Sequence, residues 1–212
     1  MLDIYPWQQT LWQQIVMRNQ HAHAYLLHGP AGIGKRVLAN QLAARLLCQQ
    51  PLALAACGEC KSCHLLAAGT HPDFYVLEPE EADKAIKVDQ VRDLVDFVVQ
   101  TPQLGGRKLV LLEPAEAMNP NAANALLKSL AEPAGTTVMP LLSHQPSRLL
   151  PTVRSRCVQQ ACPLPDETQS LDWMQVAHPE LDRQLAHELL RLSGGSPLTA
   201  LRLRALDVIG LR

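Results

Sequence analysis

Aromatic side chains are scarce in this sequence of 212 residues, since Phe, Tyr and Trp together number eight. Strands favour aromatic and β-branched residues, so the scarcity argues against an all-β fold. An excess of charge is also missing, because 19 Lys and Arg residues oppose 20 Asp and Glu residues. The chain therefore has no overall positive field of the kind that would indicate binding to nucleic acid or to an acidic membrane surface. Any contact with DNA has to be local or shared with partners.

Long apolar runs are absent as well. Nowhere do eighteen apolar residues follow one another, and residues 1–6 hold an early acid with neither the basic segment nor the apolar core of a signal peptide. We therefore expect no membrane partner and a cytoplasmic location. With 47% apolar residues the chain still supports one domain, or one domain and a small satellite, which excludes collagen-like, coiled-coil and disordered chains.

Strand and helix patterns alternate over the first 163 residues. The apolar run at 24–28 stops at Gly29-Pro30, as in a buried parallel strand, and the leucines that follow predict a helix. Further elements are predicted as strands at 74–77, 108–112, 138–142 and 158–161 and helices at 35–48, 88–99 and 120–131, the last opened by Asn119-Pro120 and closed by Glu132-Pro133. This order predicts an α/β fold, with a parallel sheet covered by helices on both faces.

Pro163 and Pro165 mark the best domain boundary in the sequence. Beyond them the pattern predicts helices only, at 167–174, 181–192 and 196 to about 206. We therefore expect a first domain over residues 1–163 and a small helical domain over residues 164–212. Residues 48–72 break the periodicity of the first domain and are expected to form an irregular insertion.

A phosphate-binding motif follows the first predicted strand. Its residues are Gly29, Pro30, Ala31, Gly32, Ile33, Gly34 and Lys35, which fit the first seven positions of G-x-x-x-x-G-K-[ST]. The motif lies between a strand and a helix, where backbone N–H groups, the helix N-terminus and the lysine can meet phosphate oxygens. We therefore predict a loop of the nucleotide-binding type.

The sequence lacks two groups that ATP hydrolysis requires, one in this motif and one after a later strand. The eighth position should offer a hydroxyl to Mg²⁺, and Arg36 stands there. The acidic pair that should follow the strand at 108–112 is replaced by Glu113-Pro114. The residues alone leave three interpretations open: a glycine turn without a ligand, nucleotide binding without turnover, and an autonomous P-loop NTPase or nucleotide kinase whose metal is held by Glu113.

Four cysteines occupy the insertion with the spacing C-x₈-C-x₂-C-x₂-C; they are Cys48, Cys57, Cys60 and Cys63. Four thiolates suit a tetrahedral structural zinc, which would replace a core that the insertion is too short to build. Attached haem c at 60–64, an iron–sulfur cluster and disulfides use the same residues and remain alternatives. Cys157 and Cys162 are predicted to be small buried residues instead of ligands.

Arg156 lies between the fourth and fifth predicted strands, where a loop emerges at the end of the sheet. Taken alone, this position suits a surface arginine or a salt bridge. Taken together, residues 29–35, the four cysteines, and the segments 69–73, 124–133 and 155–157 resemble a bacterial clamp-loader subunit. The resemblance spans nearly the whole chain.

The resemblance implies an AAA+ protein with a RecA-like domain and a three-helix lid. Such loaders are hetero-pentamers of gamma/tau, delta and related subunits of the replicative DNA polymerase holoenzyme, and they use ATP to place a sliding clamp on primed DNA. Arg36 and Glu113-Pro114 resemble the loader subunit that does not hydrolyse ATP rather than the gamma/tau ATPases. By the same resemblance, Arg156 is expected to be an arginine finger that acts in trans on a gamma/tau site.

Two further departures concern the C-terminal part. Relatives that hydrolyse ATP carry a nucleotide-sensing arginine in the lid, whereas the turn at 193–199 contains none. Relatives also have a C-terminal helical collar that holds the pentamer together, and the 212 residues end before it. We therefore expect this fragment to be monomeric on its own, and we leave open whether its phosphate loop holds nucleotide.

Overall fold

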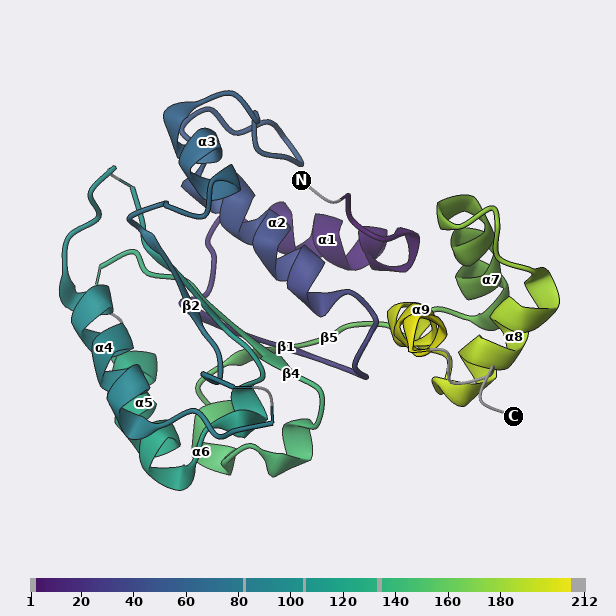
Figure 1. Cartoon of the computed structure of the whole chain (residues 1–212). Helices are drawn as coiled ribbons and strands as arrows, with labels where there is room; N and C mark the ends of the chain where they lie inside the picture. The colour runs from purple at the N-terminus through teal and green to yellow at the C-terminus, as the bar shows by residue number, and fades with distance from the viewer. Residues whose placement is uncertain (1–2, 82, 105, 133–134, 207–212) are drawn as a thin grey trace.

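The structure is a computed structural model that describes residues 3–81, 83–104, 106–132 and 135–206. A sheet lies between two layers of helices, and three further helices form a smaller body beside it (Figure 1). Pro133, which the sequence analysis placed at the end of a helix, and the last six residues lie outside the described ranges.

All five strands of the sheet are parallel, in the order β2-β3-β4-β1-β5. The strands are β1 (Ala24–His28), β2 (Phe74–Leu77), β3 (Leu109–Leu112), β4 (Met139–Ser143) and β5 (Val158–Ala161). β1 lies between β4 and β5, with His28 beside Ser143. Because the strands are parallel, their carboxyl ends share one edge, which is where open α/β sheets bind ligands.

Helices cover both faces of the sheet, as predicted. They are η1 (Pro6–Gln8), α1 (Gln9–Val16), α2 (Lys35–Leu47), α3 (Lys61–Ala67), α4 (Val88–Val99), η2 (Ala115–Ala117), α5 (Pro120–Ala131), η3 (Pro146–Arg148), α6 (Pro151–Arg154), α7 (Glu167–Ala177), α8 (Arg183–Leu192) and α9 (Pro197–Ala205). In Figure 1, α1 and α2 lie on one side of the sheet and α4, α5 and α6 on the other.

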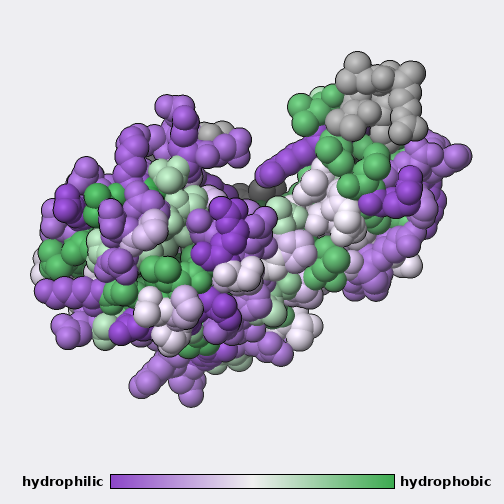
Figure 2. All heavy atoms as spheres, turned by 90° about the horizontal axis from the view of Figure 1, so that it is seen from below, coloured by the Kyte–Doolittle hydropathy of each residue, from purple (hydrophilic) through white to green (hydrophobic). Residues whose placement is uncertain are grey.

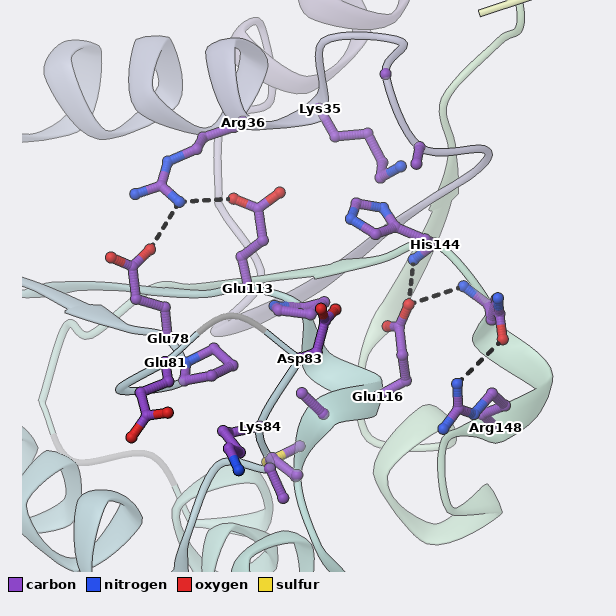
Figure 3. A pocket seen from close by; sticks show the side chains of 18 of the residues that line it. Lys35, Arg36, Glu78, Glu81, Asp83, Lys84, Glu113, Glu116, His144 and Arg148 are labelled. Atoms are coloured by element: carbon purple, nitrogen blue, oxygen red, sulfur yellow. Dashed lines mark hydrogen bonds and ion pairs between the residues drawn. The ribbon is translucent and has the colours of Figure 1, made fainter. Parts of the chain in front are cut away.

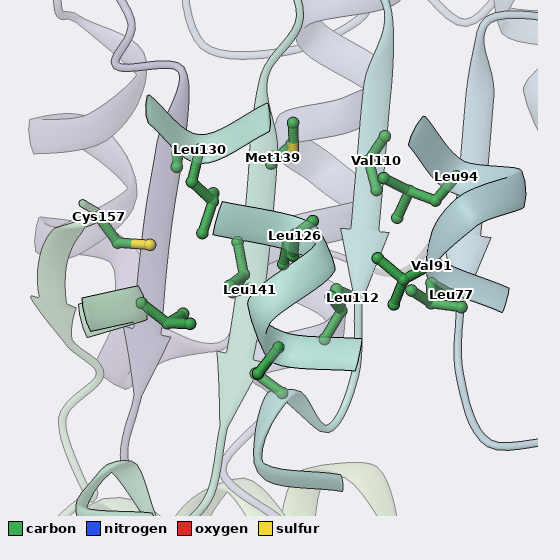
Figure 4. Packing of buried hydrophobic residues seen from close by; sticks show 14 of the residues in the cluster. Leu77, Val91, Leu94, Val110, Leu112, Leu126, Leu130, Met139, Leu141 and Cys157 are labelled. Atoms are coloured by element: carbon green, nitrogen blue, oxygen red, sulfur yellow. The ribbon is translucent and has the colours of Figure 1, made fainter. Parts of the chain in front are cut away.

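Two apolar cores follow from the alternation of side chains along each strand. Tyr25 and Leu27 of β1 pack with α1 and α2. Leu26 points to the opposite face and packs with α4 and α5, where Leu94 and Leu126 are fully buried (Figure 4). The phosphate loop is therefore attached to a strand that is buried on both faces.

Local signals explain where several elements begin and end. The Asn119 side chain accepts a hydrogen bond from the Ala122 N–H at 2.8 Å, and Pro120 is the first residue of α5, as predicted. Asp182 caps α8 in the same way. Three α-helices were not predicted: α1 near the N-terminus, α3 within the insertion and the four-residue α6 before β5.

Helices α7, α8 and α9 surround a core of their own, in which Met174 and Ala186 are fully buried. They form a smaller lobe that projects from the larger one in the space-filling view (Figure 2). The two lobes touch at the phosphate loop, since the Leu198 N–H donates to the Gly32 carbonyl at 3.1 Å. In the described part of the chain, every helix is too short or too polar to cross a lipid bilayer.

Candidate functional site

The phosphate loop lies at the carboxyl edge of the sheet, between β1 and α2. Gly32 and Gly34 have φ angles of 73° and 89°, in the left-handed region that glycine adopts without strain. A Cβ at Gly32 would collide with Thr199 of α9, and one at Gly34 would collide with the Tyr5 ring. The loop is therefore enclosed by the lid on one side and by the N-terminal segment on the other.

Lys35 is almost fully buried, and its ammonium is held by the loop itself. Its Nζ donates to the carbonyls of Gly29 and Pro30, each at 2.6 Å. Burial lowers the pKa of Lys35, with Glu113 among the groups that oppose this effect. Lys35 is thus the first residue of α2, directly after the glycine loop, and its donors are directed to backbone oxygens.

Arg36 joins two acidic residues that come from distant parts of the sequence (Figure 3). Its Nη1 lies 2.8 Å from the Glu78 carboxylate, after β2, and 3.1 Å from the Glu113 carboxylate, after β3. Burial acts against the charged guanidinium, but the two carboxylates outweigh it and raise the pKa of Arg36. Arg36 therefore places a fixed positive charge beside the acid that would hold a metal in an active ATPase.

The Glu113 side chain is only 14% exposed. Burial raises the pKa of Glu113, although Arg36 and Lys35 act in the opposite direction. Pro114 follows it and offers no group that could polarise water. The end of β3 consequently holds one carboxylate that is already paired.

The loop opens into a cavity of about 1180 Å³ at the carboxyl edge of the sheet. Glu116 lies in its wall and accepts hydrogen bonds from the backbone N–H groups of His144 and Gln145 at 2.8 and 3.0 Å (Figure 3). The turn at 193–199 contains no arginine, but Arg202, further along α9, lines this cavity. The lid therefore does contribute a cation, at a position that the sequence analysis did not consider.

Three aromatic rings close the side of the phosphate loop. Tyr5 stacks on Trp7 with ring centroids 4.9 Å apart, and Trp173 of α7 meets both rings edge-on at 5.3 and 5.5 Å. The Trp7 indole N–H also donates to the Ile33 carbonyl at 2.9 Å. This cluster connects the N-terminal segment, the loop and the lid. It was missed in the sequence analysis, although two aromatic residues so close together stand out in an aromatic-poor chain.

Arg156 lies two residues beyond the end of α6, on the surface. Val153 and Cys157, on either side of it, are buried in the core under α5 and hold the segment in place. The Arg156 Nη1 donates to the Thr152 carbonyl at 3.0 Å. Among the described residues, no carboxylate pairs with Arg156, and it does not line the cavity of its own chain.

The four cysteines of the insertion come together, as the spacing predicts. Their sulfur atoms all lie within 4.8 Å of one another, and four of the six pairs are 3.5 to 3.9 Å apart. Sulfurs at about 2.3 Å from a tetrahedral zinc would be about 3.8 Å apart. The donor set therefore fits a single tetrahedral ion.

The backbone prepares this cluster for a metal. Cys48 ends α2, Cys60 precedes α3, and Cys63 lies in its first turn. Gly58 has a φ of 80°, which allows the tight turn between the ligands. Burial acts to raise the pKa of Cys60, but hydrogen bonds from backbone N–H groups and neighbouring thiols outweigh it and lower that pKa to about 6.

A buried hydrogen-bond chain attaches the cysteine cluster to the sheet. The Ser62 hydroxyl donates to the Leu47 carbonyl at 2.6 Å and lies 2.7 Å from His71 Nε2. His71 Nδ1 accepts from the Asp73 N–H at 3.0 Å, so the proton of the neutral ring is on Nε2. The Asp73 carboxylate in turn accepts two backbone N–H groups from residues 103 and 104. The segment 69–73, one of those that carry the resemblance, therefore orients α3.

The parallel sheet, the glycine loop that precedes α2 and the helical lid define a P-loop fold of the AAA+ type. A solved structure of a DNA polymerase III gamma subunit-related protein from Thermotoga maritima matches 92% of this chain and 58% of its own, with a TM-score of 0.62 and 24% identity. Residues 6–164 match the family model described as DNA polymerase III, delta subunit. The chain belongs to the delta' subunit family of DNA polymerase III.

Two relatives show how close this membership is. DNA polymerase III subunit delta' of Pseudomonas aeruginosa is 72% identical over 98% of this chain. The subunit of the same name from Escherichia coli is 38% identical over 94% of it. The chain spans 63% and 60% of the length of these two relatives, respectively.

Proposed function

We propose that this chain is a clamp-loader subunit of DNA polymerase III that does not hydrolyse ATP and that assists a neighbouring ATPase subunit during DNA replication. The membership of the delta' family supports the clamp-loader role. The observation that carries the absence of hydrolysis is the position of Arg36, whose guanidinium joins Glu78 and Glu113.

The electrostatics of this arrangement oppose magnesium binding. Mg²⁺ needs oxygen ligands in a nearly octahedral arrangement, and a guanidinium has none to offer. The cation of Arg36 also repels a divalent ion from the Glu113 carboxylate, to which it is already paired. Hydrolysis therefore lacks both the metal site and the group that polarises water.

The lid contacts support a rigid role for the subunit. In an ATPase, a lid that moves against the phosphate loop can couple nucleotide state to shape. In this chain α9 donates a hydrogen bond to Gly32, and Trp173 packs against Tyr5 and Trp7. We infer that these contacts hold residues 1–163 and 164–212 as two domains in one arrangement, so that the subunit acts as a fixed member of a ring with gamma/tau and delta.

In this proposal, Arg156 acts in the active site of the neighbouring subunit. It is exposed and held between two buried anchors, and no carboxylate among the described residues neutralises it. Such an arginine can reach phosphates bound at an adjacent gamma/tau site and stabilise the charge that develops there. The assembled loader would then bind the sliding clamp and primed DNA, in the cytoplasm.

The four cysteines hold a structural zinc in this proposal. Four converging thiolates in a short insertion favour Zn²⁺ over harder cations. The ion would join the end of α2 to α3 and so support the helix that begins at the phosphate loop. With four thiolate ligands, the ion would have no open coordination position for chemistry.

We expect the purified chain to show no ATP turnover with Mg²⁺ above the background of its Lys35→Ala variant. The reason is that Arg36 and Pro114 remove the metal site and the water-polarising group. Steady-state phosphate release at saturating ATP measures this, with an active gamma/tau subunit as the positive control.

Turnover that is lost in Lys35→Ala would contradict the proposal and favour the autonomous NTPase or nucleotide kinase. Binding of labelled ATP, measured on the same two proteins, separates binding without turnover from a loop that holds no nucleotide. The Arg36→Thr variant extends the test, because it restores the missing hydroxyl and frees Glu113. Magnesium-dependent ATP binding should be stronger in this variant than in the parent chain.

A further inference from the structure

Acidic residues are distributed unevenly along this nearly neutral chain. Between Asp3 and Glu59 the sequence contains no Asp or Glu, although the whole chain has 20. This segment forms the strand β1 and the helices α1 and α2, which both lie on one face of the sheet (Figure 1). The opposite face is different, because α4 exposes Asp89, Asp93 and Asp96. The fold thus separates an acid-free face from an acidic one.

Four basic side chains gather where the acid-free face meets the amino edge of the sheet. Arg18 follows α1, His21 precedes β1, Arg45 lies in the last turn of α2, and Arg107 precedes β3. We name this group the basic edge. Because strands and helices run in opposite directions, it lies at the end of the sheet remote from the phosphate loop. It is therefore separate from the phosphate loop and its cavity, whereas Arg156, which precedes β5, lies at the same edge of the sheet.

The groups of the basic edge lie close enough to act on one another. Burial lowers the pKa of His21, and Arg107, Arg18 and Arg45 lower it further. Among the described residues, none of these three arginines forms an ion pair with a carboxylate. The Nε of Arg45 is buried without a hydrogen-bond partner in the same part of the chain. Positive charges that lie close together without a carboxylate partner repel one another and destabilise the fold, and a bound anion would relieve this repulsion.

Neutral groups orient two of these side chains. The Arg18 guanidinium lies over the Tyr25 ring, 5.6 Å from its centroid, and donates to Gln160 Oε1 at 3.3 Å. The Tyr25 hydroxyl accepts from the Ala22 N–H at 3.1 Å and lies within hydrogen-bond distance of His21 Nδ1, at 3.2 Å.

We infer that the basic edge binds the phosphodiester backbone of nucleic acid. Guanidinium groups match phosphate oxygens in a bidentate geometry, and several of them along one edge suit a ligand with repeated phosphates. The neighbouring exposed residues are mostly amides, namely Gln13, Gln14, Asn19, Gln20, Gln49 and Gln50, and the exposed apolar residues Met17, Leu52 and Leu54 are scattered among or after them in the sequence. Protein partners need an apolar centre, whereas interfaces with nucleic acid are polar and positive.

The test measures binding of the whole chain to a fluorescent duplex of about 20 base pairs, by anisotropy, between about 50 and about 200 mM salt. The Arg45→Gln/Arg107→Gln variant should bind at least about tenfold more weakly at low salt. Its plot of log affinity against log salt should be shallower by about 1.8, because each lost phosphate contact removes about 0.9. The inference does not depend on the proposed function, since no partner subunit is present.

The matched control is Arg92→Gln/Arg183→Gln, which removes the same charge from arginines that are paired to Asp89 and Asp172. Its affinity should stay within about twofold of the parent chain. Equal losses in both variants would overturn the inference, and so would tighter binding of polyglutamate or free pyrophosphate than of the duplex. Circular dichroism verifies folding, and the single variant Arg107→Glu repeats the test if the double variant unfolds.

Discussion

In a reconstituted clamp loader, Arg156→Ala in this subunit is expected to slow ATP cleavage at the adjoining gamma/tau site by about 10³- to 10⁵-fold, the range for arginine fingers. The guanidinium offers two parallel donors to the phosphate being transferred, and alanine leaves the developing charge without them. The substitution is made in a subunit with the full length of its relatives. A burst of phosphate release on mixing with primed DNA counts the active sites, and we expect it to fall by one site per loader.

Two variants separate this role from a structural one. Arg156→Lys keeps the charge but loses the planar fork, so most of the rate loss should remain. Arg92→Ala removes an arginine from the surface of α4 and should leave the burst unchanged. Complex formation, followed by gel filtration, should be the same for all three proteins. A normal burst with Arg156→Ala would mean that this arginine is only a surface residue.

Much of the fold could be predicted because its signals are local. Buried parallel strands are short apolar runs, and the run at 24–28 stops at a glycine loop that any reader of the sequence can find. The start of α5 has both an N-cap and a proline, and its predicted range of 120–131 is confirmed. Strand β4 was predicted one residue too early, at 138–142 instead of Met139–Ser143. Such small errors arise because the ends of a strand depend on its partners.

Two of the missed helices, α1 and α3, depend on tertiary contacts. Helix α1 has only eight residues, too few to be stable alone, and it is held because Leu11, Trp12 and Ile15 pack against β1 and α2. Helix α3 lies in a segment whose cysteines, glycines and proline indicate irregular chain. Two cysteines at its start and the hydrogen bond from Ser62 to Leu47 position it. Neither helix has a long periodic pattern of its own.

The candidate site was predictable in its parts but not in its assembly. The sequence showed that Arg36 replaces a hydroxyl and that Glu113 lacks an acidic neighbour. It could not show that the guanidinium joins Glu113 to Glu78, because Glu78 lies in a loop 42 residues away from Arg36. The aromatic contact of Trp173 with Tyr5 likewise joins segments at opposite ends of the chain. Long-range pairs of this kind follow from the sheet order and the lid, not from local spacing.

The cysteine cluster leads to the second prediction, that the purified protein contains about one zinc per chain and that Cys60→Ser loses it. Metal binding contributes directly to folding in small modules, so the loss should lower Tm by at least about 5 °C, at about 2–4 °C per kcal/mol for a protein of this size. The insertion should lose the most stability, because the proposed ion would hold together its cysteine sulfurs, which lie 3.5 to 3.9 Å apart in four pairs. Elemental analysis and thermal unfolding measure the two effects.

Cys157→Ser is the matched control, because it makes the same chemical change at a buried cysteine outside the cluster. It can cost stability through the polar hydroxyl that it buries, but it should leave the zinc content at about one per chain. This comparison separates loss of the ion from loss of packing, which thermal unfolding alone would confuse. Full zinc content in Cys60→Ser would contradict the assignment. If the parent protein contained iron and absorbed visible light, the cluster would have to be assigned as an iron–sulfur centre instead of a zinc site.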